Sequence, residues 1–157
     1  MLIRRPQGFT LIELVSVLLL MAILAVVAAD QWPGFGINLS AQTDQLLNDI
    51  RYTQFLAMNR GQRYRINFAA DHYWITDASG TVTYPFPANG ASAVTLTSGV
   101  TLSTTDSFLV FDGNGVPYTT ASSPGTPLAA DAVITLSADG MTSTLTVSPE
   151  TGYVVKS

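Results

Sequence analysis

The chain changes from basic to apolar within the stretch Gly8-Phe9-Thr10-Leu11-Ile12-Glu13. Residues 9–29 hold only three polar side chains, those of Thr10, Glu13 and Ser16. A helix of about 21 residues is about 30 Å long, which matches the hydrocarbon core of a bilayer. The sequence therefore predicts a transmembrane helix that holds one carboxylate.

Glu13 is the unusual residue of this predicted helix. An ionised side chain in a membrane helix costs about 2.5–3.5 kcal/mol on insertion scales, so its presence indicates a partner supplied by function. A plain membrane anchor, whose glutamate reaches back to the interface, is the structural alternative. Arg4 and Arg5 precede the apolar run without any acidic residue, which predicts that the N-terminus stays in the cytoplasm.

The sequence from Arg5 to Glu13, followed by the long apolar helix, resembles the class III leader of type IV pilins and type II secretion pseudopilins. The resemblance implies a leader of residues 1–8, cut between Gly8 and Phe9 by a prepilin peptidase, and N-methylation of Phe9. It also implies that Glu13 pairs with the Phe9 amine of a neighbouring subunit during assembly. An amine that arrives only when two subunits dock would offset the cost of a carboxylate in lipid.

The same resemblance implies a location and a set of partners. The precursor is expected to cross the bacterial inner membrane once, with its N-terminus cytoplasmic and its domain periplasmic, before it enters a pilus or pseudopilus. Its partners would be the prepilin peptidase, other pilin or pseudopilin subunits, and an inner-membrane assembly platform with its ATPase. The ATPase would supply the energy of extraction. This interpretation requires no cofactor.

Composition limits the rest of the chain. After a leader and an anchor, the 157 residues leave one domain of about 125, enough for a modest core. The absence of cysteine excludes disulfides, thiol nucleophiles and cysteine-based metal sites. The chain has 7 basic and 11 acidic residues, and two of the basic ones lie in the predicted leader. The mature protein is therefore acidic, which does not favour nucleic acid as a partner.

A linker and a second helix are expected next. Residues 30–38 contain Pro33 and two glycines, which predicts a kink or a short unwound stretch at the membrane interface. From about 39 to 60, before Gly61, apolar residues recur at spacings of three and four, which predicts an amphipathic helix. Asp44 and Asp49 are expected on its solvent side. The predicted buried stripe consists of Leu39, Thr43, Leu46, Leu47, Ile50, Gln54, Ala57 and Met58.

After Gly61 the pattern alternates with the period of a β-strand, with Arg63, Arg65 and Asn67 on the predicted outer face. The inner face would carry Tyr64, Ile66 and Phe68. Turn residues separate further predicted strands at 72–76, 81–86, 94–96, 107–111, 133–136, 142–147 and 153–155. Residues 119–130 lack periodicity, which predicts a mobile surface loop.

A helix followed only by strands predicts an α+β fold. The helix of 39–60 would pack on an antiparallel β-sheet built from residues 63–157, within a periplasmic domain of residues 39–157. With the transmembrane segment 9–29, this is the type IV pilin fold that the resemblance implies: a long N-terminal helix, half membrane-spanning and half amphipathic, on a β-sheet domain.

The second half of the chain resembles a narrower group. The sequence from Leu46 to Gly61, followed by a strand, is similar to the helix-to-sheet crossing of minor pseudopilin H (the GspH/FimT-like group). Residues 111–117 and 151–154 resemble the late hairpin and last strand of that group, which includes minor pilins of MSHA systems. The resemblance implies a minor pilin or pseudopilin, a structural subunit that enters or initiates a filament.

Two other functions of the same chain are alternatives. Arg60, Arg63 and Arg65 lie close together and could contact the phosphates of DNA, as in DNA-binding minor pilins of natural transformation, although the rest of the domain is acidic. The chain could also be a membrane-anchored periplasmic domain that does not assemble. A gel shift with the soluble domain would test the first alternative.

Catalysis and metal binding have little support in the sequence. The one histidine, His72, follows Asp71, and neighbours in a strand point to opposite faces, so the two are not expected to form part of a triad. We therefore predict that the protein is not an enzyme. Asp112 and Asn114 carry oxygens that suit calcium, yet the loop lacks the acids of an EF-hand and is better interpreted as a hairpin turn. His72 and Trp74 share a face and could form a subunit contact.

Overall fold

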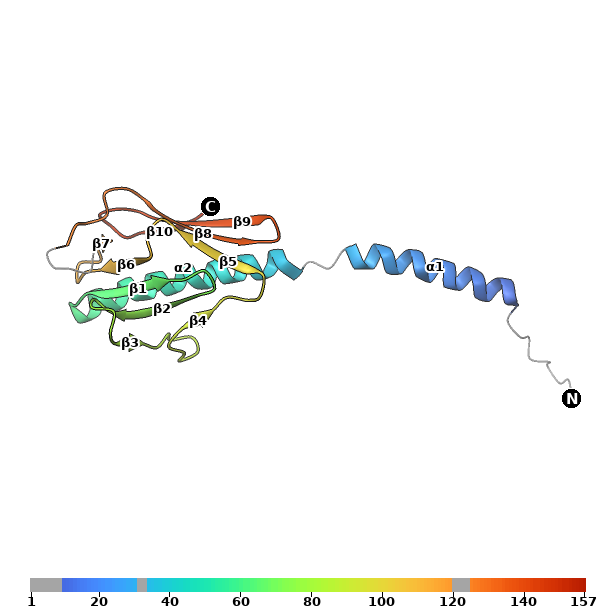
Figure 1. Ribbon diagram of the computed structural model, residues 1–157, viewed down its shortest axis with the longest axis horizontal. Helices are drawn as coiled ribbons and strands as arrows, with labels where there is room; N and C mark the ends of the chain where they lie inside the picture. The colour runs from blue at the N-terminus through green and yellow to red at the C-terminus, as the bar shows by residue number, and fades with distance from the viewer. Residues whose placement is uncertain (1–9, 31–33, 120–124) are drawn as a thin grey trace, which may run out of the picture. The chain divides into compact units, whose positions relative to one another are not determined.

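The computed structural model describes residues 10–30, 34–119 and 125–157, with side chains from 10–25, 38–119 and 125–157. The chain divides into two compact units, residues 1–34 and residues 35–157 (Figure 1). Residues 35–157 form the sheet domain.

Helix α1, Leu11–Asp30, is the described element of the first unit. It starts after Thr10, whose carbonyl and hydroxyl oxygens accept from the N–H of Glu13 at 3.1 and 3.4 Å. This is the capping arrangement expected of a threonine at a helix N-terminus. Within the described residues, no helix has the length and hydropathy needed to cross a membrane.

Helix α2, Gly34–Arg60, starts five residues before the predicted position 39. The predicted linker of residues 30–38 is therefore helical at both ends, and its residues 31–33 lie outside the described ones. Glycine costs about 1 kcal/mol in a helix, a weak preference that a long packed helix overrides. The end at Arg60 agrees with the prediction, because Gly61 has a φ of 60° and Gln62 N donates to Ala57 O, which is a Schellman cap.

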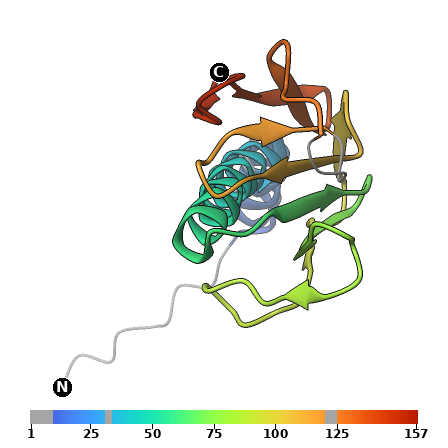
Figure 2. The same cartoon turned by 90° about the vertical axis from the view of Figure 1, so that its left-hand side faces the viewer.

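The rest of the sheet domain consists of antiparallel strands in two sheets, so the prediction of an α+β fold is confirmed (Figures 1 and 2). Sheet A has the order β3-β2-β1-β6-β7, and β4 also pairs with β2. Its strands are β1 (Tyr64–Phe68), β2 (His72–Asp77), β3 (Thr83–Tyr84), β4 (Val94–Thr95), β6 (Phe108–Phe111) and β7 (Pro117–Tyr118). Sheet B has the order β10-β9-β8-β5, with β5 (Val100–Thr104), β8 (Ala132–Ala138), β9 (Met141–Val147) and β10 (Val154–Lys156).

Two strands were missing from the prediction. β5 alternates between buried apolar side chains, Val100 and Leu102, and exposed polar ones, so its periodic signal was present. β7 is only two residues long and contains a proline, and such a strand has no periodicity to detect. The β8–β9 hairpin agrees with its turn signal: Asp139 and Gly140 both have positive φ, as a two-residue primed turn requires.

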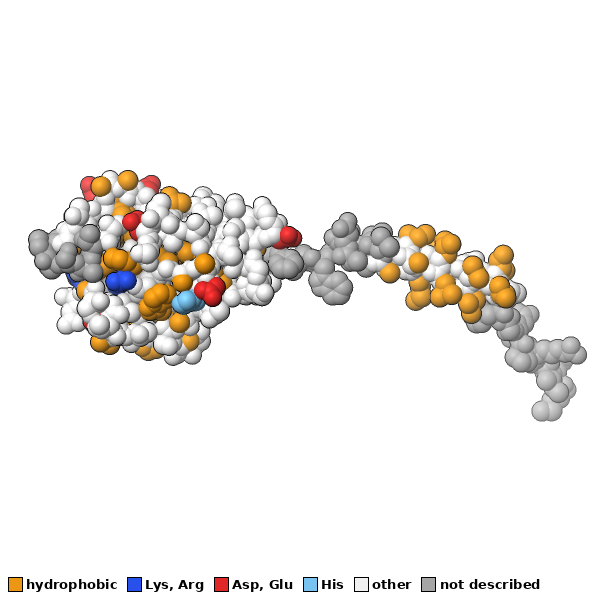
Figure 3. Space-filling view, viewed as in Figure 1, with side chains coloured by type: hydrophobic (Ala, Val, Ile, Leu, Met, Phe, Trp, Pro, Cys, Tyr) orange, Lys and Arg blue, Asp and Glu red, His pale blue; other side chains and the backbone are white. Residues whose placement is uncertain are grey.

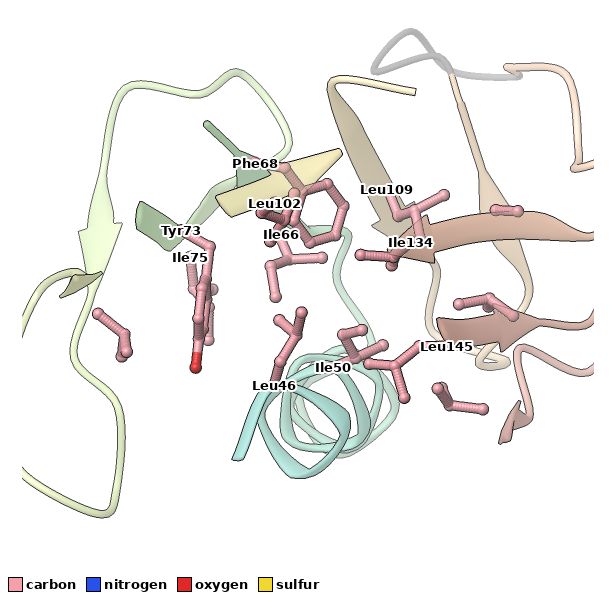
Figure 4. Packing of buried hydrophobic residues seen from close by; sticks show 14 of the residues in the cluster. Leu46, Ile50, Ile66, Phe68, Tyr73, Ile75, Leu102, Leu109, Ile134 and Leu145 are labelled. Carbon is pink, nitrogen blue, oxygen red and sulfur yellow. The ribbon is translucent and has the colours of Figure 1, made fainter. Parts of the chain in front are cut away.

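The core lies between α2 and both sheets (Figure 4). Viewed from the end in Figure 2, the strands curve around one side of α2. Leu46 and Ile50 project from the helix toward side chains of sheets A and B and are fully buried. The predicted apolar stripe is confirmed at most positions, since Leu39, Thr43 and Ala57 are also buried. Met58 is an error of the prediction, because it is 45% exposed at the end of the helix.

Two polar residues that the sequence placed on the outside are buried. Asn67 is 2% exposed because it donates to Trp74 O and Thr76 Oγ1 and accepts from Arg65 Nε, so neighbouring side chains cover it on the outer face of sheet A. Asp49 is 4% exposed and faces Tyr73 of β2. In both cases a partner comes from β2, and the periodicity of α2 or of β1 alone does not reveal it.

Residues of α2 connect the two sheets. Gln54 Nε2 donates to the carbonyl oxygens of Gly115, in the β6–β7 turn of sheet A, and Thr151, in the β9–β10 turn of sheet B, at 2.9 and 2.7 Å. Arg51 Nη2 donates to Val154 O of β10 at 2.9 Å. At the far end of β10, Lys156 Nζ lies 2.7 Å from Asp44 Oδ1 of α2. The C-terminal strand is thus tied to the helix along its length.

The predicted loop of residues 119–130 is partly structured. Leu128 is 8% exposed, its N–H donates to Pro117 O, and Pro127 forms a β-bridge with Tyr118. Residues 127 and 128 are therefore held to the sheet, contrary to the prediction of a mobile loop. Residues 120–124 lie outside the described ones.

Candidate functional site

The predicted processing and assembly site divides between described and undescribed residues. Gly8 and Phe9, the predicted cleavage and methylation positions, lie outside the described residues. Glu13 is described and lies in the first turn of α1, with its side chain exposed. Among the described residues, none donates a hydrogen bond to its carboxylate.

Thr10 and Glu13 have the spacing of a capping box, which gives Glu13 a structural role beside the one expected in assembly. In a capping box the threonine accepts from the glutamate N–H, and the glutamate side chain accepts from the threonine N–H. The first of these bonds is present at 3.4 Å. Glutamine can replace glutamate in this motif, whereas it cannot pair with an ammonium group as an anion, so the two roles are separable by substitution.

The surface of α1 around Glu13 is apolar on all sides. Every large apolar side chain from Leu11 to Leu24 is at least 48% exposed, and Leu11 reaches 83% (Figure 3). Ser16 does not make this surface polar, because its hydroxyl donates to Ile12 O within the helix at 2.7 Å. A helix that is hydrophobic all round is normally buried, so the exposed apolar surface of α1 indicates that other apolar groups cover it.

The three arginines considered for DNA contact are each placed over an aromatic ring. Arg60 Cζ lies 5.6 Å from the ring centre of Tyr84, Arg63 Cζ 4.4 Å from Tyr118, and Arg65 Cζ 3.8 Å from Phe108. These are cation–π distances. Arg65 also donates through Nε to Asn67 Oδ1. The rings give these arginines a packing role in the sheet domain, and their contact with DNA stays a prediction.

His72 and Asp71 are closer than the sequence analysis predicted. His72 Nδ1 lies 2.6 Å from Asp71 Oδ1, and this hydrogen bond lowers the pKa of Asp71. Asp71 precedes β2, so strand alternation does not apply to it, and the argument against their contact was wrong. The pair lies at the surface, and the His72 ring stacks on the Trp74 ring, with ring centres 5.0 Å apart, as their shared face predicts. Within the described residues, no group of three acidic or histidine side chains could hold a metal ion.

The Asp112 carboxylate organises the β6–β7 turn from inside. Its Oδ1 accepts from Asn114 N and Val116 N, both at 2.9 Å, and its Oδ2 accepts from Tyr118 OH at 3.2 Å. Gly115 N closes the turn by donating to Asp112 O. The Asp112 carboxylate therefore has a structural role in this turn. Asn114 takes part in the turn through its backbone N–H.

We expect Asp112→Ala to destabilise the sheet domain by about 1–2 kcal/mol, as loss of a side-chain cap does, because two backbone N–H groups lose their acceptor. Asn114→Ala keeps those acceptors and serves as the control, with an expected change below about 0.5 kcal/mol. Urea denaturation with calcium and with EDTA measures both effects. A calcium site would instead make both variants lose a calcium-dependent rise in the unfolding midpoint.

Comparison with known proteins finds matches to both parts of the chain, the first helix and the sheet domain. The prokaryotic N-terminal methylation motif matches residues 3–29, and the family of type II transport protein GspH matches residues 42–152. Among solved structures, two crystal forms of the type IV minor pilin FimU of Pseudomonas aeruginosa PAO1 are similar, at 16% identity and TM-scores of 0.57 and 0.56. The similarity covers 76% of this chain and 87% and 92% of the FimU chains. A search of curated proteins finds no match.

The methylation motif on the first helix and the structural likeness to FimU define the class: the protein has the type IV pilin fold and carries a prepilin motif. Within that class, the chain belongs to the GspH family, since the family covers most of its length. Proteins of this family and fold are structural pilin subunits, and membership implies interaction with other pilin subunits and with a prepilin peptidase. The predicted resemblance to minor pilins and pseudopilins is confirmed.

Proposed function

We propose that the protein is a minor pilin or pseudopilin whose precursor is cut between Gly8 and Phe9, N-methylated on Phe9, and then incorporated into a pilus or pseudopilus, or initiates one. The exposed Glu13 carboxylate on an otherwise apolar helix surface carries this proposal. An ionised carboxylate is costly in lipid unless it pairs with a cation. The Phe9 amine of a neighbouring subunit would be that cation.

Residues 9–29 hold the precursor in the inner membrane, with Arg4 and Arg5 on the cytoplasmic side and the sheet domain in the periplasm. The exposed apolar surface of α1 supports this location, because lipid would cover it before assembly. The two arginines support the orientation through the positive-inside rule.

During assembly, Glu13 brings the incoming subunit into register with its neighbour. The carboxylate and the liberated amine attract each other most strongly in the low-dielectric interior formed by packed helices. Each α1 then exchanges lipid for the apolar helices of other subunits, which costs little hydrophobic free energy because both surroundings are apolar. An inner-membrane platform and its ATPase supply the work of extraction.

Glu13→Gln tests this function in the native host. Glutamine preserves the size of the side chain and the capping-box spacing with Thr10, whereas it removes the charge. Loss of one partner from a buried ion pair costs about 3–5 kcal/mol, so the variant should be at least about a hundredfold depleted from sheared filaments. Immunoblots of the membrane and filament fractions measure incorporation, and mass spectrometry of the membrane form measures cleavage and methylation.

Ser16→Ala is the matched control on the same helix, since the Ser16 hydroxyl bonds only within α1 among the described residues. It should be processed and incorporated like the native chain. Incorporation of Glu13→Gln at the native level would contradict the role of the carboxylate. Native protein that retains residues 1–8 would contradict the proposed processing.

A further inference from the structure

Asp49 is a buried acid for which the proposed assembly mechanism has no use. It lies in the middle of α2, is 4% exposed, and its Oδ2 accepts one hydrogen bond from Tyr73 OH of β2 at 2.7 Å. Tyr73 is 1% exposed and packs edge-on against Phe86, with ring centres 5.5 Å apart. The pair therefore joins the helix to sheet A inside an apolar environment.

A carboxylate in this environment is poorly compensated. An ionised carboxylate has about four lone-pair sites for hydrogen bonds, and the described side chains provide Tyr73 as its donor. Burial disfavours the charged form and raises the pKa of Asp49, and the Tyr73 bond opposes this effect only in part. Burial likewise raises the pKa of Tyr73, so its hydroxyl keeps its proton and remains the donor.

Other charged groups of the same helix do not compensate Asp49. Asp44 is exposed and paired with Lys156, and Arg51 is exposed and bonded to Val154 O. From the opposite side, Tyr73 is the titratable group that contacts the carboxyl, and Phe86 behind it is apolar. The backbone carbonyl of Asp49 accepts from Thr53 Oγ1, which leaves the carboxyl group unaffected.

We propose that Asp49 and Tyr73 form a pH-sensitive latch between α2 and β2 that holds the sheet domain more tightly in mildly acidic than in alkaline conditions. The sign follows from proton linkage. A carboxyl whose folded-state pKa lies above its unfolded value binds its proton more tightly in the folded state. Its contribution is fully present below the unfolded value of 3.8 and is lost as the pH rises through the folded value.

Urea denaturation of the full chain in a nonionic detergent, between about pH 4 and pH 9, tests the latch, with far-ultraviolet circular dichroism as the readout. Three variants isolate the effect: Asp49→Asn, Tyr73→Phe, and Asp131→Asn as an exposed-carboxylate control. The ratio of the native to the Asp49→Asn unfolding constant should rise with pH, by up to about tenfold per unit in the range where Asp49 ionises.

Tyr73→Phe removes the donor of the ionised carboxylate and so raises the folded-state pKa of Asp49 further. Its unfolding constant should therefore rise with pH over a wider range, and by a larger total factor, than that of the native chain. Asp131→Asn should follow the native curve. Parallel curves for the native chain and Asp49→Asn would overturn the latch. If Asp49→Asn does not fold, a Tyr73→Phe curve parallel to the native one would overturn it instead. The assembly experiment on Glu13 is independent of either result.

Discussion

Gly152→Ala is expected to lower the free energy of unfolding of the sheet domain by about 2–4 kcal/mol. Gly152 lies in the β9–β10 turn with a φ of 65°, a conformation that costs a residue with a Cβ about 1 kcal/mol. A Cβ there would lie 2.6 Å from Gln54 Nε2, 2.7 Å from Gly115 O and 3.0 Å from Phe111 Cε1. The Gln54 side chain could move only by giving up its bonds to Gly115 and Thr151, and Gly115 O belongs to the backbone.

Gly140→Ala is the matched control, because Gly140 also has a positive φ, of 77°, and nothing lies within 4 Å of its ideal Cβ position. It should cost only the backbone term of about 1 kcal/mol. Urea denaturation followed by circular dichroism compares the two variants. An equal loss in both would show that the close approach at Gly152 relaxes without cost.

Ile50→Ala is expected to destabilise the domain by about 2–5 kcal/mol, the range for truncation of a buried aliphatic side chain. Ile50 is fully buried on α2 and projects into the core that α2 forms with both sheets (Figure 4). The resulting cavity would be lined by rigid strands and a long helix, which limits how far the structure can relax.

Phe55→Ala, on the same helix, serves as the control for Ile50→Ala. Phe55 is 57% exposed, so its truncation should change the free energy of unfolding by no more than about 0.5 kcal/mol. The two substitutions share the helix and the new residue and differ in burial. A loss at Ile50 below about 1 kcal/mol would contradict the assignment of this residue to the centre of the core.

Local patterns predicted the elements of this fold better than their arrangement. The stripe around Leu46 and Ile50 follows helical spacing, and β1 follows strand alternation, so both could be found in short windows of sequence. The division into two sheets could not be found in this way, because it depends on pairings such as β5 with β8, whose residues are far apart in the chain. Asp49 was misplaced for the same reason, since its partner Tyr73 belongs to another element.

The candidate site shows a similar division. Glu13 could be singled out from sequence, because one acid in an apolar run is unusual whatever surrounds it. The contacts of Arg63 with Tyr118 and of Arg65 with Phe108 depend on how β1, β6 and β7 pair, so the packing role of these arginines could not be found from the sequence. The capping-box spacing of Thr10 was present in the sequence and was overlooked.

The bonds between β10 and α2 affect how neighbouring copies of the protein can pair their strands. A border strand normally offers its free carbonyl and amide groups to any extended chain nearby, and this is a common route to aggregation. Here the Arg51 guanidinium donates a hydrogen bond to the Val154 carbonyl oxygen, and the Lys156 side chain forms an ion pair with Asp44. Copies held side by side at high local concentration would therefore be discouraged from swapping or stacking strands at this border, so that contacts between them are left to other surfaces.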